Sequence, residues 1–200
     1  MSLPQAHLVD DDEAIRDALA WLLKSRGLPC ATYESAETFL AAWHPGLCGC
    51  VVLDMRMSGM SGLDCFDILH SRGARLPVIF LTGHGDVPMA VATLKKGAFD
   101  FFEKPFNDND LATRISEAMA TDCKQRAAEA CADTVNAQLA RLTPRERQIM
   151  ELVLAGKYNK VIADELNISM RTVEVHRANL FDKMQVKTAV ELANLLQRTP

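Results

Sequence analysis

Short apolar segments of strand length alternate with helical patterns over residues 1–120 of this 200-residue chain. The strand-like segments are nearly continuous in apolar residues, which is typical of parallel strands that helices cover on both faces. They are Ala6–Val9, Pro29–Tyr33, Cys50–Leu53, Val78–Leu81 and Phe99–Glu103. The helical patterns are Ala14–Arg26, Ala36–Trp43, Leu63–Ser71, Pro88–Lys96 and Asp110–Thr121. This alternation predicts a doubly wound α/β fold with a five-stranded parallel sheet.

Polar side chains follow the expected strands. Asp10–Asp12 follow the first strand and Asp54 the third, while Thr82 and Lys104 follow the fourth and fifth. Because ligands of such sheets bind beyond the carboxyl ends of the strands, we expect these groups to converge. Clustered carboxylates need a cation, and hard oxygen ligands suit Mg²⁺. A carboxylate can also accept a phosphoryl group, whose charge Mg²⁺ and Lys104 would offset.

Each of these residues also has a simpler interpretation. Asp10–Asp12 are placed to cap the helix that begins near Ala14, where acidic residues are favoured. Asp54 alone fits a turn, Thr82 alone a strand end, and Lys104 alone a solvated charge. Their shared position at the same end of successive strands favours a phosphoryl-acceptor site.

Four segments of this region resemble the receiver domain of two-component response regulators, most of all its FixJ-like branch: HLVDDDEAIRDAL, VVLDMRMSGMSGLD, VIFLTGHGDVPMAV and GAFDFFEKPF. The resemblance covers residues 5 to about 120 and implies the flavodoxin-like receiver fold. It implies that Asp54 is the phosphoacceptor. It also implies a site for Mg²⁺, with Mn²⁺ as the alternative ion, made by Asp10, Asp11, Asp54 and the backbone carbonyl of Arg56.

The same resemblance gives roles to residues on the later strands. Lys104 is expected to pair with the phosphoryl group and Thr82 to hydrogen-bond it, while Phe101 matches the aromatic switch position. The Lys104–Pro105 bond is expected to be cis. The family usually has proline where this chain has Ser58, so we expect a more flexible loop there. The sequence does not say whether this change lengthens or shortens the lifetime of the phosphoryl group.

A segment without glycine or proline, DCKQRAAEACADTVNAQL, occupies residues 122–139 and is expected to be helical. Two questions stay open from the sequence. The segment either continues the preceding helix or breaks near Asp122, and it either carries dimer contacts or is a passive spacer.

The last sixty residues carry strong helix signals. Thr143 is placed as an N-cap, Pro144 follows at the first helical position, and Glu146 completes a capping box. Further helical patterns are Asn159–Leu166, Ser169–Met184 and Thr188–Gln197. A short helix, a tight turn and a longer helix are typical of a helix-turn-helix. The sequence therefore predicts an all-α domain of four helices.

The charge is unevenly shared along the chain. Residues 1–120 carry 10 Lys and Arg against 16 Asp and Glu, whereas residues 141–200 carry 10 against 7. A basic domain behind an acidic one favours a nucleic-acid partner for the second domain. From the pattern alone, a small helical bundle that docks on protein is the alternative.

The segment LTPRERQIMELVLAGKYNKVIADELNISMRTVEVHRANLFDKM resembles the LuxR-type DNA-binding domain, over roughly residues 139–198. The resemblance implies that the third helix enters the major groove. Expected phosphate contacts are Lys160, Arg171, Thr172, His176 and Lys183. Expected base contacts are Glu174, Val175 and Arg177. For His176, a structural role with a bond to the backbone is the alternative.

Together, the two resemblances imply a response regulator transcription factor with a receiver domain at 1–121, a linker at 122–139 and a DNA-binding domain at 140–200. A partner histidine kinase would phosphorylate Asp54, and the expected dimer surface is Val87–Lys96 with Phe99–Thr121. The homodimer would bind promoter DNA and act with RNA polymerase, chiefly as an activator. The chain would then be no enzyme beyond the receiver's own phosphoryl transfer and slow dephosphorylation. A phosphatase or phosphotransferase that uses Asp54 is the rival from another class.

The sequence also bears on the cell compartment. No apolar run approaches the roughly 20 residues that a membrane span needs. The start, MSLPQAHLVDDD, lacks the basic and apolar regions of a secretory signal, and the six cysteines form no CxxC pair. We therefore expect a cytoplasmic protein with reduced thiols and no membrane partner.

Overall fold

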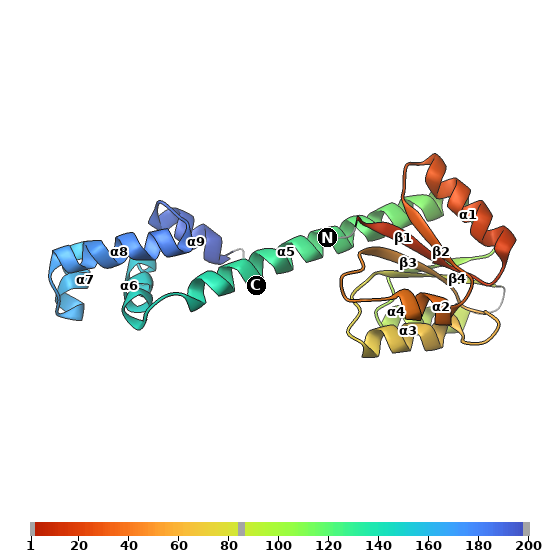
Figure 1. Cartoon of the computed structure of the whole chain (residues 1–200), viewed down its shortest axis with the longest axis horizontal. Helices are drawn as coiled ribbons and strands as arrows, with labels where there is room; N and C mark the ends of the chain where they lie inside the picture. The colour runs from red at the N-terminus through yellow and green to blue at the C-terminus, as the bar shows by residue number, and fades with distance from the viewer. Residues whose placement is uncertain (1–2, 84–86, 198–200) are drawn as a thin grey trace. The chain divides into compact units, whose positions relative to one another are not determined.

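The computed structural model describes residues 3–83 and 87–197, which fall into two compact units with a boundary between Gln125 and Arg126. The first unit contains the strands β1 (Gln5–Val9), β2 (Cys30–Tyr33), β3 (Gly49–Asp54), β4 (Val78–Thr82) and β5 (Asp100–Glu103). Its helices are α1 (Glu13–Ser25), α2 (Ala36–Ala42), α3 (Gly62–Ser71), α4 (Val87–Lys95) and the first part of α5 (Asp108–Ala140). Figure 1 shows these elements along the chain.

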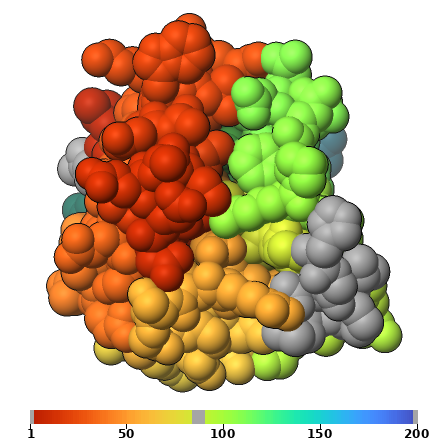
Figure 2. All heavy atoms as spheres, turned by 90° about the vertical axis from the view of Figure 1, so that its right-hand side faces the viewer, coloured from red at the N-terminus to blue at the C-terminus, as the bar shows by residue number. Residues whose placement is uncertain are grey.

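The strands form one parallel sheet in the order β2-β1-β3-β4-β5, which confirms the predicted fold class. The chain passes from β1 outward to β2 and then returns to β3 on the other side of β1. This reversal makes a topological switch point between β1 and β3, the place where doubly wound sheets bind their ligands. Figure 2 looks at the carboxyl edge of the sheet, where the segments after β1, β3 and β5 adjoin.

Helices cover both faces of the sheet, because successive side chains of each buried strand point to opposite sides. In β3, Val51 and Leu53 pack with α2 and α3, whereas Cys50 and Val52 pack with α1 and α5. Figure 1 shows α2 and α3 on one side and α1 with the start of α5 on the other. Apolar layers therefore cover both faces of the sheet, and the polar side chains of interest lie at the ends of the strands.

The second unit contains α6 (Pro144–Leu154), α7 (Asn159–Leu166), α8 (Met170–Met184) and α9 (Ala189–Gln197) around one apolar core. The capping box predicted for α6 is present, with Thr143 accepting from the amide of Glu146 and the Glu146 side chain accepting from the amide of Thr143. Ser169 caps α8 in the same way, by accepting from the amide of Thr172. Asn167, with a φ of 53°, ends α7 in the left-handed conformation and so makes the sharp turn to α8.

Helix α5 runs without a break from Asp108 to Ala140, so the segment predicted as a linker is helical and continues the last receiver helix. It is by far the longest helix described, yet most of its second half is exposed. Within residues 3–83 and 87–197, no helix is both long enough and apolar enough to cross a membrane.

Candidate functional site

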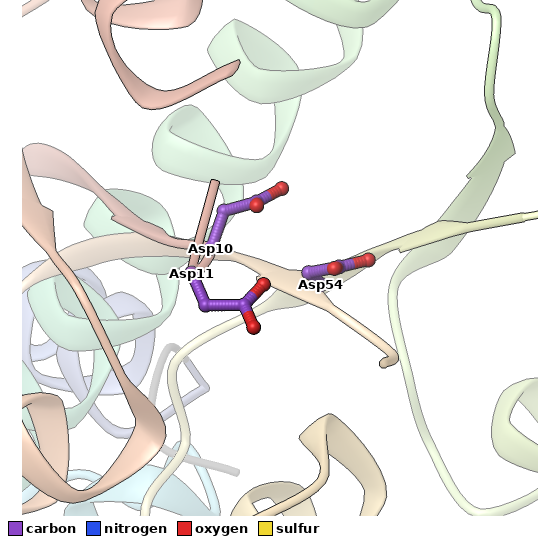
Figure 3. Close-up of side chains that lie close together, drawn as sticks. All are labelled: Asp10, Asp11 and Asp54. Atoms are coloured by element: carbon purple, nitrogen blue, oxygen red, sulfur yellow. The ribbon is translucent and has the colours of Figure 1, made fainter. Parts of the chain in front are cut away.

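Three carboxylates meet at the switch point of the sheet. Asp10 lies directly after β1, Asp11 follows it, and Asp54 is the last residue of β3. One carboxylate oxygen from each of them lies within 4.8 Å of those of the other two, and Figure 3 shows the three side chains side by side at the strand ends. Asp10 and Asp54 are only 1% and 7% exposed, whereas Asp11 is open to solvent. The structure therefore brings together the acidic residues that the sequence predicts for the metal site.

Lys104, directly after β5, completes this cluster. Its ammonium lies 2.8 Å from Oδ2 of Asp10 and 3.2 Å from Oδ1 of Asp54. The Lys104–Pro105 peptide bond is cis, as the resemblance implied. Asp10, Asp11, Asp54 and Lys104 are called the acidic pocket below. In it, a single ammonium offsets part of the repulsion among three carboxylates.

Burial and charge act against each other in the acidic pocket. Burial raises the pKa of Asp54, and although Lys104 opposes this, the negative charge of Asp10 adds to it and the pKa stays raised. Burial lowers the pKa of Lys104, but the hydrogen bonds and charges of Asp10 and Asp54 outweigh burial, so its pKa is raised. The hydrogen bond from the Ser58 amide is the main cause of the lowered pKa of Asp11. Carboxylates outnumber cations here, so the pocket favours an added positive ion.

The donor set of the acidic pocket fits Mg²⁺. The donors are all carboxylate oxygens, the hard ligands that Mg²⁺ prefers. The exposure of Asp11 leaves one side open for the water ligands that Mg²⁺ usually keeps. Asp10, Asp11 and Asp54 are the residues that would hold the ion.

The sequence left open whether Asp10–Asp12 cap a helix, and the structure shows that one of the three does so. Asp12 is the N-cap of α1, where its side chain accepts from the amide of Ala14 at 2.9 Å. The amide of Asp12 in turn donates to Oδ1 of Asp10 at 2.9 Å. The three consecutive aspartates therefore have two different roles. Asp12 caps the start of α1, whereas Asp10 and Asp11 belong to the acidic pocket.

The backbone around Asp54 is tightly placed. The amide of Arg56 donates a hydrogen bond to the Asp54 carboxylate. Gly62, the first residue of α3, comes so close that a Cβ added to it would lie 2.2 Å from the carbonyl oxygen of Asp54. The role of the Arg56 carbonyl as a metal ligand stays a prediction.

The two expected switch residues lie on β4 and β5. Thr82 ends β4, is 2% exposed, and donates from Oγ1 to the carbonyl oxygen of Gly83 at 3.0 Å. Phe101 is half-buried and packs against the core on the α2 and α3 side of the sheet. The backbone of Thr82 accepts from the amide of Lys104 at 2.7 Å, which ties both strand ends together. The motif residues 84–86 lie outside the described part of the chain.

The expected DNA-reading residues lie on α8 and its surroundings. Arg171, Glu174 and Val175 are exposed, as is Lys160 on α7. Thr172 is half-buried and its hydroxyl lies 2.8 Å from that of Ser169. The exposed surface of α8 thus presents cationic, acidic and apolar side chains of the kinds that meet phosphates and base edges.

Two of the expected contact residues are also engaged within the domain. Arg177 donates to Oδ1 of Asn159 at 2.8 Å, and its guanidinium lies over the ring of Phe181. Lys183 donates to both carboxylate oxygens of Glu146, at 2.9 and 2.7 Å. Glu146 is 2% exposed, so this ion pair joins the start of α6 to the end of α8 in a mostly buried position. His176 is half-buried.

Sequence reasoning missed a surface hollow of about 580 Å³ beside the helix-turn-helix. Its lining includes Tyr158, Asn159, Lys160 and Arg177, and the Tyr158 side chain is 82% exposed. The sequence signal was present, because Lys157-Tyr158-Asn159-Lys160 sets an aromatic residue between two lysines. That composition suits a polyanion.

Comparisons with known proteins cover nearly the whole chain. Residues 6–116 match the response regulator receiver domain family, and residues 140–196 match the bacterial regulatory proteins of the luxR family. The transcriptional regulatory protein FixJ of Azorhizobium caulinodans is 45% identical over 97% of this chain and 92% of its own length. The C4-dicarboxylate transport transcriptional regulatory protein DctR of Rhodobacter capsulatus is 48% identical over 94% of this chain and 97% of its own length.

A solved structure agrees with these relatives. The low-resolution structure of the response regulator StyR has a TM-score of 0.89 and 38% identity, and covers 98% of this chain and 100% of its own. Sequence relatives, domain order and the acidic pocket all lead to the same family. The chain belongs to the response regulators that join a receiver domain to a LuxR-type helix-turn-helix domain, and it is a homologue of the FixJ and DctR transcriptional regulators of two-component systems.

Proposed function

We propose that this response regulator accepts a phosphoryl group on Asp54 from a partner histidine kinase and, once phosphorylated, binds promoter DNA as a homodimer. The observation that carries the first step is the position of the Lys104 ammonium between Asp10 and Asp54 at the carboxyl edge of the sheet. We further propose that it acts in the cytoplasm with RNA polymerase, chiefly as an activator. In this proposal the receiver domain spans residues 1–121, the linker spans 122–139 and the DNA-binding domain spans 140–200.

The proposed transfer needs a nucleophile and a way to offset charge. An oxygen of Asp54 attacks the phosphorus, and the phosphorus–nitrogen bond to the kinase histidine breaks, with its electron pair left on the imidazole. Lys104 then pairs with a phosphoryl oxygen, and the Thr82 hydroxyl donates a hydrogen bond to another. The three carboxylates and the carbonyl of Arg56 would hold Mg²⁺, or Mn²⁺ in its place, and the bound ion would supply positive charge to offset that of the phosphoryl oxygens. Hydrolysis of the acyl phosphate resets the receiver, which turns over no other substrate.

The signal would leave the pocket through β4 and β5. A backbone hydrogen bond joins Thr82 to Lys104 at the ends of β4 and β5. A shift of Thr82 toward the phosphoryl group would therefore displace β5 and change the position of Phe101. The proposed dimer surface is Val87–Lys96 with Phe99–Thr121. Val91 and Leu94 support it, since both are apolar and 43% and 36% exposed on α4. The side chains of residues 87–90 lie outside the described part.

For DNA, we propose that α8 enters the major groove, with a half-site for each protomer about one helical turn apart. Lys160, Arg171, Thr172 and His176 are the proposed phosphate contacts. Glu174, Val175 and Arg177 are the proposed base contacts. The exposure of Arg171, Glu174 and Val175 supports this assignment.

Lys183 is a different case. The sequence predicts a phosphate contact, but the ammonium is held by both oxygens of the buried Glu146 carboxylate. We propose that Lys183 fixes the end of α8 against α6 and so positions the recognition helix.

The switch is tested by the mass of the full chain in light scattering, with and without Mg²⁺ and beryllofluoride, a phosphoryl mimic. We expect a monomer that becomes a dimer only when both are added. Asp54→Asn should stay monomeric, whereas Asp133→Asn, an exposed site on α5, should respond as wild type. A mass that does not change with beryllofluoride, or an Asp54→Asn variant that still dimerises, would overturn the proposal.

A further inference from the structure

A hydrogen bond links the two loops that border the acidic pocket. The amide of Ser58, in the loop after β3, donates to Oδ2 of Asp11 at 2.7 Å. The two residues are 47 positions apart in the sequence. Asp11 is the exposed member of the pocket, so loss of this bond would leave its side chain less restrained.

The loop that carries Ser58 is held on both sides. The amide of Met60 donates to Oε1 of Glu37 at 2.9 Å, and the amide of Gly62 donates to the carbonyl of Met55 at 3.1 Å. These bonds fix the backbone around Ser58, so its N–H meets Asp11 from a held position. These bonds anchor the loop, and the greater flexibility expected from the absence of proline stays a prediction.

By the resemblance to receiver domains, Ser58 stands where the family usually has proline. Proline has no backbone N–H, so a chain with proline at this position cannot make the bond to Asp11. The departure from the family pattern therefore adds a donor to the pocket.

We propose that Ser58 is a positioning residue for the metal site, because its backbone N–H orients the carboxylate of Asp11 for Mg²⁺. The bond engages Oδ2 of Asp11, and the Ser58 side chain also hydrogen-bonds this carboxylate. Hydrogen bonds to ligating carboxylates hold them in place, and loss of such partners typically weakens metal binding by about 10- to 100-fold. The inference rests on the proposed role of Asp11 as a metal ligand.

A matched pair of variants separates the backbone donor from the side chain. Ser58→Pro removes the N–H, whereas Ser58→Ala keeps it and removes only the hydroxyl. Binding of Mg²⁺ alone to the full chain is measured by calorimetry, without any phosphoryl donor, and binding of Mn²⁺ by the spin-resonance signal of the free ion. We expect Ser58→Pro to bind both ions about 10-fold more weakly, and Ser58→Ala to stay closer to wild type than to Ser58→Pro.

Unchanged or tighter binding in Ser58→Pro would overturn the proposal, since the bond would then be neutral or would hold Asp11 away from the ion. Equal losses in both variants would assign the effect to the hydroxyl and overturn it as well. Asp11→Asn tests the underlying role separately. If Asp11→Asn binds Mg²⁺ as wild type does, the assignment of Asp11 fails, whatever Ser58 does.

A second measurement does not depend on the folding of Ser58→Pro. Amide hydrogen exchange in the metal-free wild-type chain should show slow exchange at Ser58. In Asp11→Asn, where the acceptor loses its charge, exchange at Ser58 should speed up severalfold, whereas exchange at Met60, which bonds to Glu37, should not change. Equal exchange at Ser58 in the two proteins would refute the bond on which the proposal depends.

Discussion

The carboxylate of Asp122 accepts a hydrogen bond from the backbone amide of Gly49 at 2.9 Å, and so joins α5 to the first residue of β3. Asp122 is 2% exposed, and it lies at the edge of the sheet opposite the acidic pocket. Gly49 has a φ of 119°, and a Cβ there would lie 1.9 Å from the carbonyl oxygen of Gln5. The sheet thus holds α5 as far as Asp122, the first residue of the predicted linker.

Asp122→Ala should destabilise the receiver domain. The change leaves the Gly49 amide buried without its acceptor, which costs about 1–3 kcal/mol. Calorimetric unfolding of the full chain should show a lower melting temperature for the receiver transition only. Asp133→Ala, at an exposed position of the same helix, is the control and should melt as wild type. An equal melting temperature for Asp122→Ala would show that the bond adds nothing to stability.

Lys104→Met should bind Mg²⁺ more tightly than wild type. The Lys104 ammonium pairs with Asp10 and Asp54, so it would compete with the ion for the same oxygens. Removing it leaves three carboxylates whose repulsion only the ion relieves. Isothermal titration with Mg²⁺ measures the affinity, and Lys95→Met, an exposed lysine on α4, controls for the loss of charge. Weaker binding in Lys104→Met than in Lys95→Met would contradict this competition.

Lys183→Met and Arg171→Ala should weaken DNA binding for different reasons. Arg171 is exposed, and its loss should reduce the slope of log affinity against log salt by about one, as expected for one phosphate contact. Lys183 is paired with Glu146, so its loss should lower the melting temperature of the DNA-binding domain and leave the slope unchanged. Fluorescence anisotropy with a promoter fragment at several salt concentrations measures the slope. If Lys183→Met reduces the slope as Arg171→Ala does, Lys183 contacts phosphate.

The stability that Glu146 provides should disappear in acid. Burial raises the pKa of Glu146, but hydrogen bonds from Lys183 and Thr143 outweigh burial and hold the pKa below its ordinary 4.5. A lowered pKa in the folded state stabilises the fold above pH 4.5, and this contribution is lost as the pH falls through the folded-state value. Urea unfolding should therefore show wild type more stable than Glu146→Gln at pH 7 and a shrinking difference below pH 4.5. A difference that stays constant down to pH 3 would rule out the charged pair as its cause.

The acidic pocket was predictable because it depends on strand ends. Once the apolar segments are assigned to parallel strands, the residues at the carboxyl ends of β1, β3 and β5 lie at one edge, as Asp10, Asp54 and Lys104 do. The capping box of α6 was predictable for a similar reason, since Thr143 and Glu146 interact over three residues of local helix. Both predictions use distances that the regular backbone fixes.

Contacts between loops and between separate helices were not predictable in this way. Lys183 and Glu146 are 37 residues apart on different helices, and no local spacing brings an ammonium of α8 to a carboxylate of α6. The acceptor of the Ser58 amide depends on the paths of two loops. For Asp122, the sequence left open whether the helix continues, and only packing against β3 decides it.

The close approach of Gly62 to Asp54 bears on how substitutions would be tolerated. Any side chain at Gly62 would collide with the carbonyl oxygen of Asp54 and push Asp54, the proposed phosphoacceptor, away from its partners. A saturation screen scored on transcription should therefore find Gly62 as intolerant as Asp54, although Gly62 has no reactive atom. Scored on abundance alone, substitutions at Gly62 should be depleted and Asp54→Asn should not. The comparison of the two screens would separate a residue selected for its shape from one selected for its chemistry.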